Sequence, residues 1–326
     1  PPEWFMQGGQ GDTVRLQALL KGLFTYIPGA ARILPRGRTG GTDSAVYCYE
    51  VWMKHLTMLH AHGMESVPLT LAELGPGDSL GIGLAALLSG VERYYAFDVV
   101  RYSNRAGNLA IFDELVGLFE KRAGRPSLGW PDYDRYLDGN LFPGDILSEQ
   151  QLGRSLSPER IEHIRRSLLD PDANDSMITY SVPWSGVEIM ERGKLDAVIS
   201  HAVLEHVRDI DATYRGLASW LGPGGWMSHQ IGLVSHGITR EWNGHWAIPG
   251  PLWRVIMGRR PYLLNRQPCS AHIASLERNG FEISHLMKKH RDDGIDRSRL
   301  GGFCESRDGR TWRYWGRCKG EKRRRS

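Results

Sequence analysis

A glycine turn between a strand and a helix constrains the fold more than any other feature of this sequence. Residues 69–74 form a short apolar stretch typical of a buried strand, and they run directly into Gly75-Pro76-Gly77. An apolar helix is predicted at residues 82–88, and a second strand at 94–100 contains Asp98. Glycines let the backbone turn tightly and approach a ligand, and an acidic residue at the end of the next strand can bind both hydroxyls of a ribose. The segment predicts a site for a nucleoside-containing cofactor, although ordinary strand–helix turns also use glycine.

Alternating strands and helices continue along the chain. Further strands are predicted at residues 195–200, 226–233, 281–286 and 311–318. One helix is predicted to begin at about Val203, and two more are predicted at 213–221 and 271–279. Strands separated by helices favour parallel βαβ units. We therefore expect an α/β fold: a Rossmann-like, doubly wound and mostly parallel sheet.

The flanking segments suggest additions to this sheet. Residues 1–66 are predicted to form an N-terminal helical cap, with helices at 12–25 and 45–62, and residues 67–326 the main domain. Residues 120–176 interrupt the alternation and are predicted to be a helical insertion packed on the sheet. The tail at residues 319–326 is basic. A short terminal basic run is typically solvated, so we do not expect a nucleic-acid partner.

Composition excludes several classes of protein. The 326 residues are 41% hydrophobic and 24% charged, as in globular proteins. No apolar run approaches the roughly 18–20 residues that span a membrane, so no span is expected. The four cysteines are scattered and the first residues do not read as a signal peptide, which predicts reduced cysteines in a cytoplasmic protein. The sequence leaves the oligomeric state open and is compatible with a homo-oligomer.

The spacing of the glycines indicates which cofactor binds. Glycines at 75, 77 and 81 do not fit G-x-G-x-x-G, the dinucleotide pattern, because the third comes one residue late. Glu73, just before the turn, can meet a cationic ammonium group directly or through water. S-adenosylmethionine offers an ammonium and a sulfonium where NAD has a pyrophosphate, so the segment favours S-adenosylmethionine.

Four motifs in order resemble those of class I S-adenosylmethionine-dependent methyltransferases. They are Glu73 to Gly77, Asp98, residues 195–207 (LDAVISHAVLEHV) and residues 221–225 (LGPGG). The resemblance covers residues 67–286 and implies a seven-stranded sheet, S-adenosyl-L-methionine as cofactor and methyl transfer as activity. Ser79 departs from it, since many members have a third glycine there, but a small serine still permits the turn.

The segments at residues 40–49 and 228–246 are similar to a bacterial subgroup of this family. Its members often accompany genes for sugar or surface-polysaccharide biosynthesis. This similarity implies O-methylation of a small hydroxylated acceptor, a sugar or a glycan intermediate.

The resemblance also assigns the cofactor site, whose predicted members are Glu73, Gly75, Pro76, Gly77, Asp98, Val99, Ser181, Val182 and Ser200. The glycine turn would pass under the methionine part, with Glu73 at its amino end. Asp98 would bind the ribose and Val99 would lie against the adenine. Ser181 and Val182 would contact the adenine edge, in a segment that an ordinary strand and turn explains equally well.

Histidines are the candidates for deprotonating a hydroxyl acceptor, because their pKa lies near 7. We expect His236 or His245 to be the base, with His229 and His201 as further candidates, although a lone histidine is more often structural. Glu241, Trp242, Asn243 and Tyr47 are predicted to contact the acceptor. No metal site is expected, because His229 and His245 lack a tight helical spacing and no aspartate cluster accompanies them.

Two other functions fit the same sequence. One is an RNA methyltransferase that uses the basic tail, and the other is a non-catalytic S-adenosylmethionine-binding protein. Binding of S-adenosylhomocysteine, turnover and salt-dependent RNA binding distinguish the three.

Overall fold

One sheet organises the structure, a computed structural model that describes residues 14–29, 41–124, 141–184, 190–289, 293–296, 300 and 311–318. The strand order is β3-β2-β1-β4-β5-β7-β6. The strands are β1 Thr70–Leu74, β2 Arg93–Phe97, β3 Ile178–Ser181, β4 Leu195–His201, β5 Leu221–Gly232, β6 Phe281–Lys289 and β7 Thr311–Cys318. Neighbours from β3 to β5 pair in parallel, whereas β7 runs antiparallel to both β5 and β6. The predicted Rossmann-like, mostly parallel α/β sheet is confirmed.

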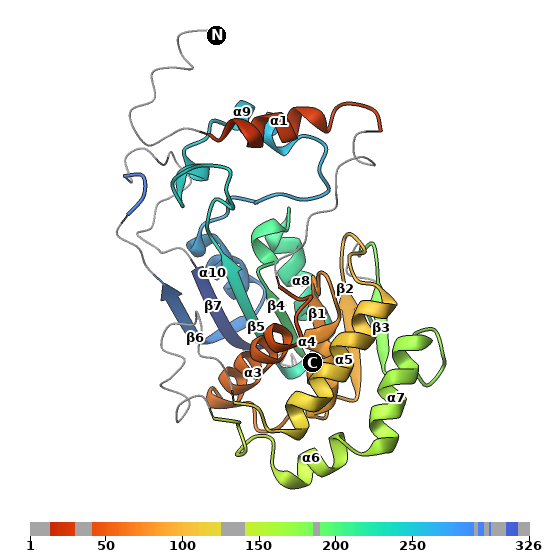
Figure 1. Ribbon diagram of the computed structural model, residues 1–326. Coiled ribbons are helices and arrows are strands. Elements are labelled where there is room, and N and C mark those ends of the chain that lie inside the picture. The colour runs from red at the N-terminus through yellow and green to blue at the C-terminus, as the bar shows by residue number, and fades with distance from the viewer. Residues whose placement is uncertain are drawn as a thin grey trace.

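Helices cover both faces of the sheet (Figure 1). They are α1 Leu16–Phe24, α3 Ala45–Ala61, α4 Gly81–Ser89, α5 Arg105–Glu120, α6 Glu149–Ser155, α7 Pro158–Leu169, α8 Ile210–Trp220, α9 Gly250–Met257 and α10 Cys269–Arg278, with short 3-10 turns η4 Leu204–His206 and η5 Gly244–Trp246. Helices α3 and α4 pack on one face, and α5 packs against both of them. Helix α7 packs beside β3 and against α4 and α5, α6 packs against α4 and α7, and α8 and α10 pack on the other face. The insertion predicted at 120–176 thus adds two helices to one face, and its residues 125–140 lie outside the described residues.

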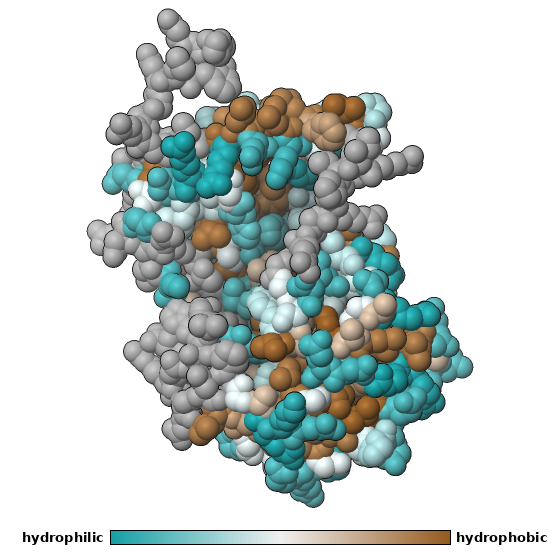
Figure 2. All heavy atoms as spheres, viewed as in Figure 1, coloured by the Kyte–Doolittle hydropathy of each residue, from teal (hydrophilic) through white to brown (hydrophobic). Residues whose placement is uncertain are grey.

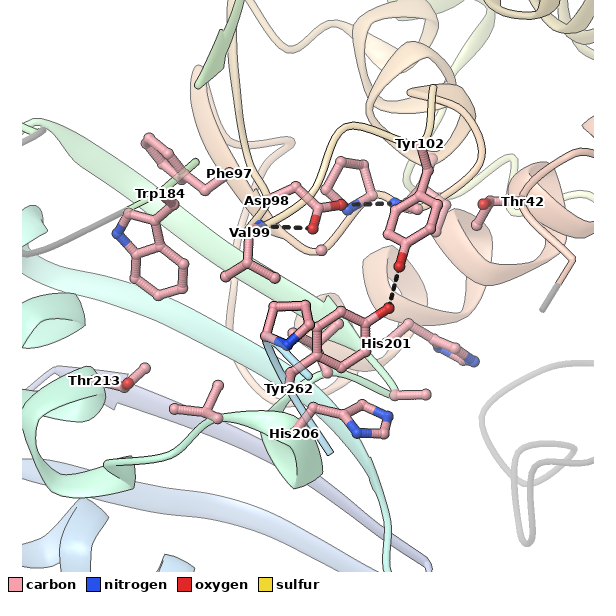
Figure 3. A pocket seen from close by; sticks show the side chains of 18 of the residues that line it. Thr42, Phe97, Asp98, Val99, Tyr102, Trp184, His201, His206, Thr213 and Tyr262 are labelled. Carbon is pink, nitrogen blue, oxygen red and sulfur yellow. Dashed lines mark hydrogen bonds between the residues drawn. The ribbon is translucent and has the colours of Figure 1, made fainter. Parts of the chain in front are cut away.

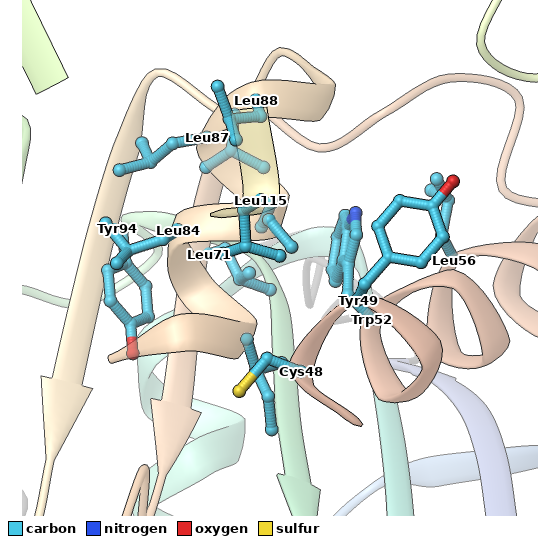
Figure 4. Close-up of a cluster of buried hydrophobic side chains, with 14 of the residues drawn as sticks. Cys48, Tyr49, Trp52, Leu56, Leu71, Leu84, Leu87, Leu88, Tyr94 and Leu115 are labelled. Atoms are coloured by element: carbon cyan, nitrogen blue, oxygen red, sulfur yellow. The ribbon is translucent and has the colours of Figure 1, made fainter. Parts of the chain in front are cut away.

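The strands supply both cores because successive side chains point to opposite faces. Leu71 joins the cluster under α3 and α4, whereas Ala72 joins the cluster under α8 and α10. Helix α3 contributes Tyr49 and Trp52 to the first cluster, beside Leu84 of α4 (Figure 4). The part of the predicted N-terminal cap at residues 45–61 therefore packs as a layer on the sheet.

Helix α1 packs through its small residues rather than its leucines. Ala18 and Gly22 are buried, and a Cβ at Gly22 would lie 2.1 Å from a carbonyl oxygen of α9. Leu16 and Leu20 are 68% and 54% exposed, and apolar residues cover the outer surface of α1 in Figure 2. The amphipathic helix predicted at 12–25 is present at 16–24, but the face that it buries is the glycine–alanine face.

The helix predicted from Val203 is wrong. Residues 204–206 form only the 3-10 turn η4, and Ala202 just before it has a φ of 57°. Asp209 then caps a new helix, α8, by accepting a hydrogen bond from the Ala212 amide at 2.9 Å. The chain therefore makes a tight turn after β4, and this turn brings residues 201–208 to the sheet edge.

Candidate active site

The strand order reverses between β1 and β4, since β2 and β3 follow on one side and β5 on the other. In open α/β sheets ligands bind at such a switch point, outside the carboxyl ends of the strands. A cavity of about 670 Å³ lies there (Figure 3). Its size falls in the range of about 300–1,000 Å³ that is usual for small-molecule sites. Residues 75–77, 97–99 and 201–203, which end or follow β1, β2 and β4, all line it.

The glycine turn lines the cavity as predicted by its sequence. Gly75 and Gly77 have φ values of 65° and 77°, which favour glycine. A Cβ at Gly75 would lie 2.5 Å from a methyl of Val203, so that position also has no room for a side chain. Pro76 lies between them and lines the cavity. The turn presents bare backbone to any ligand in the cavity.

Asp98 is fixed at the cavity wall by backbone amides. Its Oδ1 accepts a hydrogen bond from the Val99 amide at 2.7 Å, and its Oδ2 accepts one from the Gly77 amide at 3.4 Å (Figure 3). Burial raises the pKa of the carboxyl group, and these amides act in the opposite direction. Val99 is 42% exposed and lines the same cavity. Both residues line the cavity, and their contacts with ribose and adenine stay predictions.

The loop before α3 is hydrogen-bonded to the residues that follow the glycine turn. The Thr42 hydroxyl accepts a hydrogen bond from the Asp78 amide at 2.8 Å, and the Ser79 hydroxyl donates to the Thr42 carbonyl. Ser79, the departure from the family pattern, therefore holds the turn to the segment before α3. Thr42 and Tyr47 line the cavity. The contact of Tyr47 with the acceptor stays a prediction.

Glu73 does not line the cavity. The Tyr94 hydroxyl donates a hydrogen bond to its Oε2 at 2.5 Å, and the carboxyl group is buried. Burial is the main cause that raises the pKa of Glu73 to about 8. Because this carboxyl group is buried and lies outside the cavity lining, its contact with an ammonium group, direct or through water, stays a prediction.

The remaining predicted cofactor residues also lie outside the cavity lining. The Ser181 carbonyl accepts a hydrogen bond from the Asp98 amide at 3.1 Å, so this residue pairs within the sheet, and Val182 follows it. Trp184, two residues later, lines the cavity instead. Ser200 is fully buried, and its Oγ lies 2.8 Å from Nδ1 of His229.

The four candidate histidines separate into two pairs. His201 and His236 line the cavity. His229 and His245 are 1% and 2% exposed, and burial lowers the pKa of each to about 3. A neutral histidine inside a core cannot reach an acceptor, so the geometry argues against His229 and His245 as bases.

The predicted acceptor contacts after β5 are structural. Asn243 is buried, and its side chain exchanges hydrogen bonds with the Ile295 backbone at 2.9 and 2.8 Å. The Trp242 indole donates to the Asp293 carbonyl. Neither they nor Glu241 line the cavity. These side chains fasten residues 293–296 to the segment after β5.

Several residues that line the cavity are not among the predicted site residues. They include Tyr102, Trp184, His206, Arg208, Thr213 and Tyr262. The hydroxyls of Tyr102 and Tyr262 meet across the cavity although they are 160 residues apart (Figure 3). Only the density of aromatic residues around 242–262 pointed toward Tyr262, and it did not distinguish a cavity wall from core packing.

Glu205, His206 and His236 meet at the wall opposite Asp98. One ligand atom of each lies within 4.8 Å of the other two. Burial raises the pKa of Glu205 to about 8 and lowers that of His206 to about 4. The expectation of no metal site rests on residues 229–245, which include His236, and it does not take in Glu205 or His206.

Comparisons with known proteins give matches among solved structures only. No protein-family model and no curated protein matches the chain. An S-adenosylmethionine-dependent methyltransferase from Mesorhizobium loti is 15% identical, with 81% of this chain and 97% of that chain covered and a TM-score of 0.40. One from Methanosarcina mazei is 11% identical, with 81% and 98% covered and a TM-score of 0.42. Phosphoethanolamine N-methyltransferase 2 of Haemonchus contortus, in complex with S-adenosyl-L-methionine, is 14% identical, with 87% and 59% covered and a TM-score of 0.41.

Among the residues that the structure describes, no helix is both long and apolar enough to cross a membrane.

Proposed function

We propose that the chain is an S-adenosyl-L-methionine-dependent methyltransferase that methylates a hydroxyl group of a small acceptor. The observation that carries this proposal is the cavity at the switch point, bounded by bare backbone at Gly75 and Gly77 and by the fixed carboxylate of Asp98. A ribose diol fits an acidic residue at the end of β2, and an amino-acid chain fits the glycine turn. The four ordered sequence motifs support the same cofactor.

The reaction is an in-line displacement. The acceptor oxygen bonds to the methyl carbon while the carbon–sulfur bond breaks, and its electron pair stays on sulfur, which becomes a neutral thioether. The acceptor proton leaves to a base and then to solvent. Because the sulfonium is already activated, the protein mainly holds the two reactants in line.

His201 is the base in this proposal. It ends β4 and lines the cavity, and its ring meets that of Tyr47 edge to face with centroids 6.0 Å apart. His236 lines the cavity as well, but its Nε2 lies 3.9 Å from a carboxylate oxygen of Glu205. His236 therefore lies near a carboxyl group without a hydrogen bond to it, whereas the ring of His201 lies beside Tyr47, where β4 ends next to the glycine turn.

The acceptor is a sugar or a glycan intermediate in this proposal. Aromatic rings of Tyr47, Trp184 and Tyr262 line the cavity, and such rings provide apolar faces with polar edges. The similarity of residues 40–49 and 228–246 to the polysaccharide-associated subgroup points the same way. The basic tail that an RNA methyltransferase would use lies outside the described residues.

Calorimetric titration with S-adenosylhomocysteine tests the cofactor site. We expect binding to the wild-type chain, and Asp98→Ala should weaken it about 10- to 100-fold, since hydrogen bonds to a charged group contribute about 1.5–3 kcal/mol. Asp145→Ala, an exposed residue before α6, is the matched control and should bind like wild type. Circular dichroism checks that Asp98→Ala remains folded. Absence of binding to the wild type would end the proposal, and an unchanged dissociation constant in Asp98→Ala would remove its ribose role.

Screening activated sugars and polysaccharide fragments with a labelled methyl donor tests the acceptor. Transfer to one of them separates an enzyme from a non-catalytic binder. Binding of the cofactor product without transfer to any tested compound would contradict the sugar assignment while leaving the cofactor site intact.

A further inference from the structure

Three side chains with metal-binding atoms converge beside the cavity, and two of them, His206 and His236, belong to its lining. Glu205 and His206 come from η4, and His236 comes from the loop after β5. His236 Nε2 lies 3.9 Å from Glu205 Oε1, and one ligand atom of each residue lies within 4.8 Å of the others. A tetrahedral site with bonds of about 2.1 Å requires ligand atoms about 3.4 Å apart. Small side-chain movements therefore suffice to close the three atoms around one ion.

Two polar atoms of this cluster lack hydrogen-bond partners among the described residues. Glu205 is 2% exposed, and its Oε1 accepts a hydrogen bond from the Gly232 amide at 3.0 Å. Its Oε2 is buried without a partner, and so is Nδ1 of His206. The gap of 3.9 Å between Glu205 and His236 is too long for a hydrogen bond. Buried polar atoms are normally satisfied, and a cation would satisfy this carboxylate and this imidazole together.

The backbone around the cluster is held in place. Asn265 donates from its backbone amide to the Glu205 carbonyl at 2.7 Å, and its side chain donates to the Leu204 and Val207 carbonyls at 2.7 and 2.9 Å. A Cβ at Gly232 would lie 2.8 Å from Glu205 Oε1, so glycine at that position leaves room for the carboxylate. Such support fixes ligand geometry in metal sites.

We propose that Glu205, His206 and His236 bind a divalent transition-metal ion whose remaining coordination positions face the cavity. Two imidazoles and one carboxylate suit Zn²⁺, Mn²⁺, Fe²⁺ or Co²⁺ better than Mg²⁺ or Ca²⁺, which prefer oxygen ligands. His206 and His236 line the cavity together with Gly75 and Asp98. The ion would therefore be accessible to a molecule bound beside the cofactor.

The role of the ion rests on the proposed function. If the chain transfers a methyl group, the ion binds the acceptor hydroxyl oxygen and favours its deprotonation, as bound metals do for coordinated water. The acceptor oxygen then carries out the displacement described above, and its proton passes to His201 and to solvent.

The test measures metal binding without cofactor or acceptor. The full chain is treated with a chelator, dialysed and titrated with Zn²⁺ by calorimetry, and Co²⁺ is added in parallel to record its visible absorption. We expect one ion per chain, with cobalt absorption typical of bound imidazole. Glu205→Gln and His236→Ala should each weaken Zn²⁺ binding at least tenfold. His60→Ala, a partly exposed histidine at the end of α3, is the matched control and should bind like wild type.

Each outcome decides the proposal. His236→Ala changes a side chain that is 37% exposed, so it is the variant best able to stay folded if Glu205→Gln does not. Failure of the wild type to bind one ion, or unchanged binding in His236→Ala, would overturn the site. Zn²⁺ binding by a chain that does not bind S-adenosylhomocysteine would keep the site and remove its role in methyl transfer. Binding of S-adenosylhomocysteine by a chain that does not bind Zn²⁺ would keep the cofactor site and reject the metal site.

Discussion

Histidines that look equivalent in the sequence differ in burial, and burial decides which of them can contact a molecule in the cavity. His201 lines the cavity, whereas His229 is buried on β5 with its Nδ1 2.8 Å from Ser200 Oγ of β4. We predict that His201→Ala lowers turnover about 10²- to 10⁴-fold, the usual contribution of a general base. The dissociation constant of S-adenosylhomocysteine should stay within about threefold. Transfer of labelled methyl to the acceptor found by screening measures turnover, and calorimetry measures the dissociation constant.

His229→Ala is the matched comparison at this scale. It should lower the free energy of unfolding by about 1–3 kcal/mol, because it leaves the buried Ser200 hydroxyl without that partner. Turnover per folded molecule should remain close to wild type. If His201→Ala kept full turnover, the base would have to be another group on the cavity wall.

Between elements, one carboxylate joins α8 to α10. Asp211 Oδ1 accepts hydrogen bonds from the Ser275 hydroxyl and from Arg278 Nη2, both at 2.8 Å. Arg278 first, and then Ser275, lower the pKa of Asp211 to about 2. A carboxyl group whose folded pKa lies below its unfolded value of about 3.9 stabilises the fold above that value, and this contribution disappears as the pH falls through about 2.

Asp211→Asn should therefore destabilise the chain at pH 6, and its difference from wild type should shrink as the pH falls from 4 toward 2. Urea unfolding at pH 6, 4 and 3 measures the difference. Asp145→Asn, which changes an exposed carboxylate before α6, is the control. A difference that stays constant with pH would mean that the ion pair does not contribute through its charge.

The sequence predicted those elements whose signals are local. The glycine turn and Asp98 lie within one strand–helix–strand unit, and the structure brings them within hydrogen-bond distance. The turn at η4 was mistaken for a helix because apolar spacing alone cannot distinguish one 3-10 turn from the start of a longer helix. The acceptor end of the cavity was least predictable. It depends on the contact of Tyr102 with Tyr262 and on the approach of His236 to Glu205, which only the closed tertiary fold creates.

Over the whole molecule, both faces of the sheet bury histidines. The face under α3 and α4 is a largely apolar cluster (Figure 4), and it also buries His55 of α3, whose Nδ1 lies 2.6 Å from Ser228 Oγ of β5. The opposite side, under α8 and α10, buries two histidines: His229 on β5, and His272 on α10 with its Nδ1 3.0 Å from the Tyr214 hydroxyl. The cavity lies at the sheet edge between these faces, so its shape depends on the stability of both.

This burial makes the fold sensitive to mild acid. Burial lowers the pKa of His229 to about 3 and that of His272 to about 4. Both histidines stay neutral in the folded chain but bind a proton in the unfolded chain below about pH 6.5. Unfolding then takes up protons, so stability falls as the pH drops from about 6.5 toward 4, by at most about 1.4 kcal/mol per pH unit for each histidine.

Urea unfolding at pH 7, 6 and 5 should show this slope in the wild-type chain. His272→Gln removes one titrating group, so it should reduce the slope by up to about 1.4 kcal/mol per pH unit, even if the loss of the Tyr214 contact lowers stability at every pH. An equal slope in wild type and His272→Gln would show that His272 binds its proton as readily in the folded chain as in the unfolded one. The α10 side of the core would then have to admit water, contrary to its complete burial in the structure.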